Sequence, residues 1–226
     1  MKVALLLSGQ LRKFPEAFAT WKDWLLPQVT DTYYFCSMPA ATQPQVRDLI
    51  PDAMGGYCHD FQIPKRDVIP LQDLEHAQAM ESQWWKVQQC SYLLTDHYDL
   101  VVRMRPDLIF APGTRLDLAS FNPHFIHVPK LFSWGGYCDE LAIGGQDIMD
   151  TYCDFYNHLN CWVGGPDFNR AFPWSGNSES RLYAYLNGRV PVQRFDVGFC
   201  HVKADGRIDG TIPSEQGLMG FDGRPL

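Results

Sequence analysis

An α/β fold with a mostly parallel central sheet flanked by helices is the class that this sequence predicts. Residues 3–7 (VALLL) form a continuous apolar run followed by Ser8 and Gly9, as expected for a strand buried on both faces. Residues 14–29 repeat apolar side chains at helical spacing, and residues 31–38 have the pattern of a second strand. The order of strand, helix and strand is typical of the beginning of a parallel sheet.

The middle of the chain continues this alternation. Residues 74–98 predict a long helix with Trp84 on its apolar face. Residues 98–110 (YDLVVRMRPDLIF) predict a strand that ends near Arg105. Pro106 follows at that point, and a proline cannot donate to a sheet and holds the residue before it extended.

The remaining elements are less regular and are predicted mainly from apolar spacing and turn residues. The chain contains no internal repeat, low-complexity tract or linker, so one domain is the simplest account of it. We predict short or weaker elements as follows: a helix at 44–50, a strand at 125–129, a helix at 146–159, a helix capped at 177 or 178 and ended by Gly188, a strand at 192–208, and a tail at 206–226.

Composition excludes several classes of protein. The 226 residues are 46% hydrophobic, enough for a sizeable core, and the formal net charge of −7 comes without a basic block that would suit nucleic acid. The seven cysteines include no CxxC pair, which favours buried thiols over a disulfide framework or a zinc site. The chain has no apolar run of the roughly 20 residues that span a membrane, and its first apolar run is too short for a signal peptide. We therefore expect a soluble, intracellular protein.

Open α/β sheets bind ligands beyond the carboxyl ends of their strands, and three such ends carry polar residues here. The first is SGQLRKF, in which Ser8 and Gly9 allow close approach to the backbone and Arg12 offers a fork that matches phosphate. An ordinary turn with a solvated arginine is the alternative. The chain has neither GxGxxG nor GxxxxGK(S/T), so it lacks the dinucleotide fingerprint and the P-loop.

The second strand end holds Arg103, Arg105 and Asp107. A carboxylate at this position suits a hard divalent cation that bridges a pyrophosphate. Two arginines on one side of a strand would be costly to bury unpaired, so they meet either acidic residues or an anionic ligand. A structural ion-pair network is therefore the alternative to a ligand site.

The third strand end is DVGFCHVKADG, which contains His201 and Lys203. His201 suits either a core histidine with satisfied hydrogen bonds or a metal ligand, and Lys203 could neutralise phosphate. Lys86 lies on the helix before the arginine strand, with Gln83 one turn back. It either faces the same cleft or lies on a solvated helix face.

Acidic and aromatic residues complete the candidates. Asp139 and Glu140 are adjacent in a glycine-rich segment, and one of them could act as the base that an acceptor hydroxyl needs. Glu179 either joins them or is a first-turn acid favoured by the helix dipole. Tryptophans 84, 85, 134 and 174 could form a surface for stacking sugars, although Trp84 suits the core better.

Together these segments resemble glycosyltransferases of the GT-A fold. The likeness covers roughly residues 1–205 and is carried by LLLSGQLRKF, QWWK, YDLVVRMRPDLIF, DELAIGG with MDTYCDFY, and SESRLYAYL. It looks most like small bacterial and viral enzymes of the chlorovirus type. The resemblance implies one GT-A-like, Rossmann-like domain over residues 1–226, with a nucleotide-sugar-binding half at 1–110, an acceptor and catalytic half at 111–205, and the tail at 206–226.

The resemblance also implies a nucleotide-sugar donor and, usually, Mn²⁺ or Mg²⁺. Asp107 and His201 would hold the metal, and Asp139 would be the base of an inverting enzyme. The family has an Asp-x-Asp element where this chain has Arg105 before Asp107, so the dependence on metal is left open. The residues that would bind the nucleotide sugar lie at or near the predicted strand ends, except for Lys86 on the helix before the arginine strand: Ser8, Gly9, Gln10, Arg12, Lys86, Arg103 and Arg105.

The function that this resemblance implies is transfer of a hexose or deoxyhexose from a nucleoside-diphosphate sugar to a hydroxyl of a glycan or another acceptor. The expected location is the cytoplasm of a bacterial cell or of a virus-infected host. The alternative is a non-catalytic module of the same fold that binds a nucleotide or a glycan. A nucleotidyltransferase is disfavoured because no glycine-rich, lysine-terminated triphosphate loop occurs near the N-terminus.

Overall fold

The computed structural model describes most of the chain. The described residues are 1–38, 45–59, 74–133, 135–159 and 177–202, without the side chains of 74–77 and 202, together with the backbone of 208–209, 211–214 and 217–220. Within these residues, no helix combines the length and the apolar character that crossing a membrane requires.

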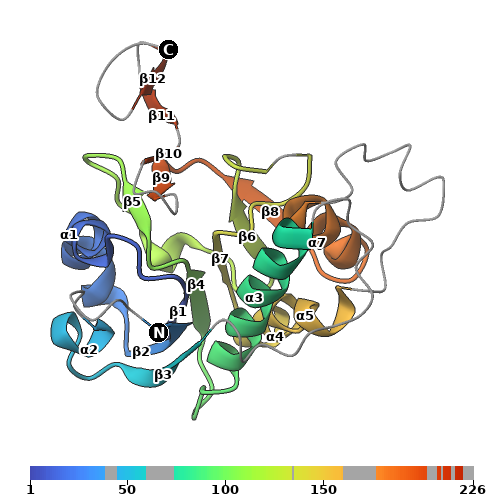
Figure 1. Ribbon diagram of the computed structural model, residues 1–226, viewed down its shortest axis with the longest axis horizontal. Coiled ribbons are helices and arrows are strands. Elements are labelled where there is room, and N and C mark those ends of the chain that lie inside the picture. The colour runs from blue at the N-terminus through green and yellow to red at the C-terminus, as the bar shows by residue number, and fades with distance from the viewer. Residues whose placement is uncertain are drawn as a thin grey trace.

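A seven-stranded sheet in the order β3-β2-β1-β4-β7-β6-β8 forms the centre of the molecule (Figure 1). β1 is parallel to its neighbours β2 and β4, whereas β7 runs antiparallel to β4 and β6. This arrangement confirms the predicted α/β class with a mostly parallel sheet. The strands are β1 (Val3–Gly9), β2 (Asp31–Ser37), β3 (Met54–Cys58), β4 (Leu100–Met104), β6 (Ile126–Pro129), β7 (Leu141–Gly144) and β8 (Val192–Phe195).

Helices cover both faces of the sheet, and each face has its own apolar core (Figure 1). In β1, Leu5 and Leu7 enter one core while Ala4 and Leu6 enter the other, which explains the continuous apolar run. The first face carries α1 (Phe14–Leu25), η1 (Leu26–Gln28) and α2 (Val46–Leu49). The second carries α3 (Leu74–Ser91), α4 (Gln146–Cys153), α5 (Phe155–His158) and α7 (Ser178–Leu186). A short η3 (Leu118–Ser120) precedes β6.

The strand predicted to end near Arg105 is present as β4, and a second strand that was not predicted, β5, follows it in another sheet. β4 belongs to the central sheet, whereas β5 (Leu108–Phe110) pairs antiparallel with β9 (Phe199–Val202). Pro106 lies between β4 and β5, where it ends the ladder as expected. The single strand predicted over 192–208 is divided between two sheets. β8 belongs to the central sheet, and β9 belongs to the small sheet that contains β5. Val197 is buried between them, and the carbonyl of Gly198 accepts from the N–H of Ala111 at 2.9 Å, which draws the chain to the small sheet.

Several element ends differ from the prediction. α3 ends at Ser91 rather than at residue 98, and the Ser91 hydroxyl donates to the Gln88 carbonyl at 2.8 Å. The predicted tail contains β10 (Ile208–Asp209), β11 (Thr211–Ser214) and β12 (Gly217–Gly220), and the last two pair as a hairpin. The Asn177 cap of α7 is confirmed, since its side chain accepts from the N–H of Ser180 at 2.9 Å. The six described cysteines are buried thiols, as predicted.

Candidate functional site

The candidate site lies where the carboxyl ends of β1 and β4 meet the amino end of β7. Because β7 runs antiparallel to β4, the residues before β7 face those that follow β4. The backbone N–H of Arg105 donates to the carbonyl of Glu140 at 3.0 Å and fixes this junction. The junction brings together most of the predicted site residues: Ser8, Gly9, Arg103, Arg105, Asp107, Asp139 and His201.

Arg103 is fully buried, yet none of its hydrogen-bond partners is a carboxylate. Its Nε donates to Oγ of Ser8 at 3.2 Å, and its Nη1 donates to the backbone carbonyl of Asp139. The guanidinium carbon lies 5.9 Å from the centroid of the Trp84 ring. Its Nη2 has no hydrogen-bond partner among the described residues. Buried charges are normally paired, so a cation in this state is suited to receive an anion.

Arg105, two residues further along, is enclosed by carboxylates. Its Nε and Nη2 donate to the two oxygens of Asp107 at 2.9 and 2.7 Å, and its Nη1 donates to Oε1 of Glu140 at 3.3 Å. Nδ1 of His201 lies 2.8 Å from the same Glu140 oxygen. Burial lowers the pKa of Arg105, but the charges of Asp107 and Glu140 raise it above its ordinary value, so the guanidinium stays charged.

Glu140 is the centre of this network. Burial raises the pKa of its carboxyl group, but the hydrogen bond with His201 and the charge of Arg105 hold the pKa below its ordinary value. The side chain is therefore an ionised carboxylate inside the protein. Sequence reasoning weighed Glu140 only as a neighbour of Asp139, because its partners come from two other strand ends.

Asp139 is a buried carboxylate held from two sides. Nε2 of Gln83 donates to its Oδ2 at 2.7 Å, and Ser178 also hydrogen-bonds to it. Oγ of Ser178 in turn accepts from Nε1 of Trp84 at 2.7 Å. Burial and then the charge of Glu140 raise the pKa of Asp139 above its ordinary value. The carboxylate is thus a fixed group with a greater tendency to accept a proton than an exposed aspartate has.

Glu179 lies in the first turn of α7 and interacts electrostatically with Asp139. Burial raises its pKa to about 9, and the charges of Asp139 and Glu140 add to this effect. The glycine-rich loop before Asp139 packs against this turn: the N–H of Tyr137 donates to the Glu179 carbonyl at 3.1 Å, and a Cβ on Gly136 would collide with the same carbonyl. Glu179 is therefore a neutral acid at neutral pH beside a buried carboxylate.

The residues predicted to cradle the nucleotide begin at the end of β1. Gly9 has φ 139°, and a Cβ at this position would lie 3.5 Å from Cδ of Pro106. Ser8 is fully buried beneath Arg103, while Gln10 and Arg12 are half-buried in the turn that leads to α1.

Lys86 is buried, so the alternative of a solvated lysine is wrong. Its Nζ donates to Oγ of Ser82 at 2.7 Å. Burial raises the pKa of Cys36 and the charge of Lys86 counteracts that rise, which places the ammonium near the end of β2. Since Cys36 pairs in register with Gly9, Lys86 lies at the same edge of the sheet as the end of β1.

Asp107 and His201 do not fit a shared metal ion in this arrangement. Asp107 is fully buried, and both of its oxygens already accept from Arg105. Nδ1 of His201 faces Glu140 instead of Asp107. In the part of the chain that the structure describes, no group of three or more His, Cys, Asp or Glu side chains is placed to hold a metal ion.

The tryptophans are mostly structural where they are described. Trp84 is fully buried and packs edge-on against Phe155, with ring centroids 4.7 Å apart, as predicted for a core residue. Trp85 is partly buried and contacts the ring of Phe35. Trp134, Trp174 and Lys203 lie outside the described residues. Trp84 is nevertheless connected to the site, because its Nε1 donates to Oγ of Ser178. The sequence did not predict this contact, since Ser178 stands out there only as a possible helix cap.

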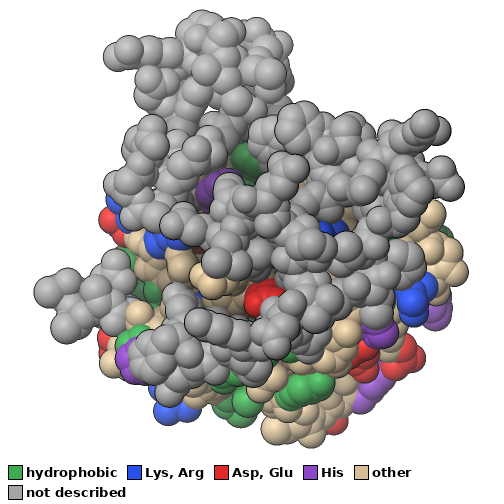
Figure 2. Space-filling view, turned by 45° about the vertical axis from the view of Figure 1, so that its right-hand side comes forward, with side chains coloured by type: hydrophobic (Ala, Val, Ile, Leu, Met, Phe, Trp, Pro, Cys, Tyr) green, Lys and Arg blue, Asp and Glu red, His purple; other side chains and the backbone are tan. Residues whose placement is uncertain are grey.

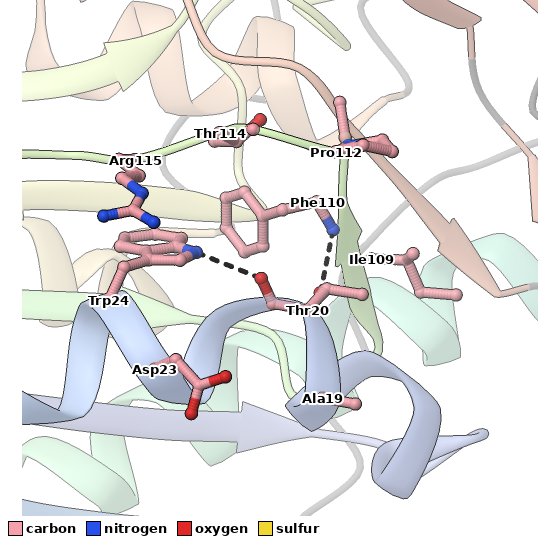
Figure 3. Close-up of a pocket in the computed structure, with 11 residues that line it drawn as sticks. Ala19, Thr20, Asp23, Trp24, Ile109, Phe110, Pro112, Thr114 and Arg115 are labelled. Atoms are coloured by element: carbon pink, nitrogen blue, oxygen red, sulfur yellow. Dashed lines mark hydrogen bonds between the residues drawn. The ribbon is translucent and has the colours of Figure 1, made fainter.

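Figure 2 turns the α7 side of the molecule forward and shows an acidic side chain near the middle of this face, with a histidine above it. A separate pocket of about 320 Å³ lies between α1 and β5 (Figure 3). Trp24 and Phe110 form its inner wall, and Asp23 and Arg115 are exposed at its rim. Its wall includes residues of β5, which begins directly after Asp107, but none of the predicted site residues lines it.

Comparison with known proteins does not identify a family. No family model matches the chain, and no curated protein matches it. Mouse xyloside xylosyltransferase 1, solved in its apo form, is a similar structure: it is 8% identical, has a TM-score of 0.48, and the match covers 86% of this chain and 85% of that chain. A likeness of this degree carries no inference about activity. The resemblance to chlorovirus-type enzymes finds no match in these comparisons.

Proposed function

We propose that this protein is a glycosyltransferase that uses a nucleoside-diphosphate sugar. Arg103 carries the proposal: it is a fully buried guanidinium that hydrogen-bonds to no carboxylate, in the same junction as the Asp139 carboxylate. A diphosphate supplies an anionic oxygen to which Nη2 of Arg103 can donate, and an acceptor hydroxyl supplies a proton that Asp139 can take. Transfer of a sugar from a nucleotide to a hydroxyl uses both groups in one reaction.

In the proposed reaction, the acceptor oxygen attacks the anomeric carbon of the donor while the bond from that carbon to the phosphate oxygen breaks. The acceptor proton passes to a carboxylate oxygen of Asp139. The electron pair of the broken bond leaves with the nucleoside diphosphate, whose charge is stabilised by Nη2 of Arg103 and by Lys86. Glu179 stays protonated at neutral pH, so it adds no second negative charge beside Asp139. A single displacement of this kind inverts the anomeric configuration.

We also propose that the two parts of a single domain over residues 1–226 divide the work. Residues 1–110 bind the donor, because Lys86 and Arg103 are in that part. Residues 111–205 handle the acceptor, because Asp139 is in that part. A hexose or deoxyhexose as the transferred sugar and a glycan as the acceptor belong to the same proposal.

Binding and turnover of donors test this function. We expect UDP, GDP or dTDP to raise the melting temperature, and the matching nucleotide sugar to be hydrolysed slowly by the wild type. Asp139→Asn should keep nucleotide binding and lower this turnover by about 10²–10⁴-fold, because it removes the base but little volume. Lys130→Ala is the control, since Lys130 pairs with Asp196 on the exposed surface. Absence of a melting shift with every nucleotide would contradict the proposal.

A non-catalytic binding module of the same fold is the second candidate. The observation in its favour is Arg105. It occupies the position where GT-A glycosyltransferases have the first acid of their Asp-x-Asp element, and it forms ion pairs with Asp107 and Glu140. Nucleotide binding by the wild type without turnover of any nucleotide sugar, with and without an acceptor glycan, would support this candidate.

A further inference from the structure

We infer that Arg105 takes the place of a divalent cation in this site, so that ligand binding here needs no metal ion. The inference deepens the proposed function and rests on its donor site. It departs from the Mn²⁺ or Mg²⁺ that the family resemblance implies.

The contacts of Arg105 are those that a bound cation would make. One guanidinium meets both oxygens of Asp107 at 2.9 and 2.7 Å and one oxygen of Glu140 at 3.3 Å. His201 approaches that same oxygen of Glu140 at 2.8 Å. The two carboxylates and the imidazole are hard or borderline donors that suit Mn²⁺ or Mg²⁺, and here they surround a positive charge that belongs to the protein.

Because the two carboxylates are buried, the contacts of Arg105 exclude a divalent metal ion from them. Asp107 is 0% exposed and Glu140 is 4% exposed, so both carboxylates need a counter-charge inside the protein. Arg105 provides it through a bidentate contact, the strongest geometry for an arginine and a carboxylate. A divalent ion on the same carboxylate would stand next to the guanidinium in a region of low dielectric, where like charges repel strongly.

Because only Arg105 is paired with carboxylates, the guanidinium of Arg103 can bind the anionic ligand. Arg105 is occupied by Asp107 and Glu140, whereas Nη2 of Arg103 has no hydrogen-bond partner among the described residues. The charge that a metal would offer to a diphosphate is therefore supplied by Arg103. Arg105 keeps the acidic residues from repelling that diphosphate.

Titration with Mn²⁺ alone tests the inference directly. Protein freed of metal with EDTA is titrated with MnCl₂ while the signal of free Mn²⁺ is followed by electron paramagnetic resonance. We expect the wild type to bind no Mn²⁺ up to about 1 mM, the weak end of protein sites for hard cations. The described donors are not placed to hold a metal ion while the guanidinium lies between them. Arg105→Ser removes the guanidinium and lets the carboxylates and the imidazole close on a cation, so it should gain a Mn²⁺ site at least about tenfold tighter than that limit. Its melting temperature should rise with Mn²⁺.

Arg105→Lys is the matched variant, because it keeps the positive charge and should bind no Mn²⁺, like the wild type. If Arg105→Ser does not fold, the wild-type titration still decides. Mn²⁺ binding by the wild type that Asp107→Asn removes would overturn the inference. A folded Arg105→Ser protein that binds no Mn²⁺ would also overturn it.

Calorimetry with UDP, GDP and dTDP separates this inference from the proposed function. The affinity of the nucleotide that binds should change by less than about twofold between EDTA and MnCl₂. Binding that appears only with Mn²⁺ would overturn the inference and leave the proposed function standing. If no nucleotide binds in either buffer, the proposed function fails, while the titration with Mn²⁺ alone still tests the inference.

Discussion

Arg103 and Arg105 lie two residues apart at the end of one strand, but their surroundings are opposite. Arg103 is buried among a hydroxyl, a backbone carbonyl and an indole ring, whereas Arg105 contacts two carboxylates. The difference arises at the start of β7, where the backbone carbonyl of Asp139 meets one arginine and the side chain of Glu140 meets the other. The two arginines therefore differ most in the charge of the groups to which they donate hydrogen bonds.

The largest expected effect is the loss of stability when Arg105 is removed. Arg105→Met should lower the free energy of unfolding by roughly 3–5 kcal/mol, because it leaves Asp107 and Glu140 buried without their counter-charge. Urea unfolding of the variant and the wild type measures this. A loss below about 1 kcal/mol would mean that the network adds little to the fold, as is typical of exposed ion pairs.

Arg103→Met should be much less destabilising. It removes two hydrogen bonds that a charged group donates to neutral groups, each worth about 1.5–3 kcal/mol, but this loss is offset because a buried charge without a carboxylate hydrogen-bond partner is removed as well. Urea unfolding under the same conditions should therefore give a smaller loss than Arg105→Met. Equal losses in the two variants would contradict the contrast between the two arginines.

Ser178→Ala should affect the base rather than the ion-pair network. The variant loses the hydrogen bond from Ser178 that lowers the pKa of Asp139 and leaves Nε1 of Trp84 without its acceptor. We expect a loss of about 1–2 kcal/mol in stability and an upward shift of the acidic limb of the pH–rate profile for donor turnover. Ser120→Ala, which removes an exposed hydroxyl, is the control. A stability loss with an unchanged pH profile would show that Ser178 does not position the base.

The last expected effect concerns Glu179 and the pH dependence of stability. Its pKa is raised from 4.5 to about 9 in the native state, so the native protein keeps a proton that the unfolded chain has released between these values. The free energy of unfolding should therefore decrease as the pH rises through this window. Glu179→Gln should make the melting temperature less dependent on pH there. Glu16→Gln, on the exposed side of α1, is the control and should leave the dependence unchanged.

The sequence predicted the fold class because local signals and tertiary structure agree there. The apolar run of β1, the helical spacing of α1 and the proline after Arg105 each determine a local feature directly. The division of residues 192–208 between two sheets was not predictable, since it depends on a contact between Gly198 and Ala111. Distant packing overrides local pattern at such points.

The sequence predicted which residues belong to the candidate site but not which of them form ion pairs and hydrogen bonds with one another. Position at a strand end identified Arg103, Arg105 and Asp107, and the glycine-rich segment identified Asp139. Nothing in the spacing of these residues says that Glu140 would pair with Arg105 and that Arg103 would have no carboxylate partner. That outcome depends on the antiparallel register of β7 against β4.

Binding of nucleoside diphosphates to Arg103→Met tests the central claim that Arg103 receives the anionic group of the ligand. Calorimetry in the presence of EDTA should show binding of UDP, GDP or dTDP to the wild type and a loss of about 10–100-fold in affinity for the variant, as expected when a charged hydrogen bond is removed. Lys130→Met, which removes an exposed positive charge, should bind as the wild type does. Equal affinity of Arg103→Met and the wild type would contradict the claim.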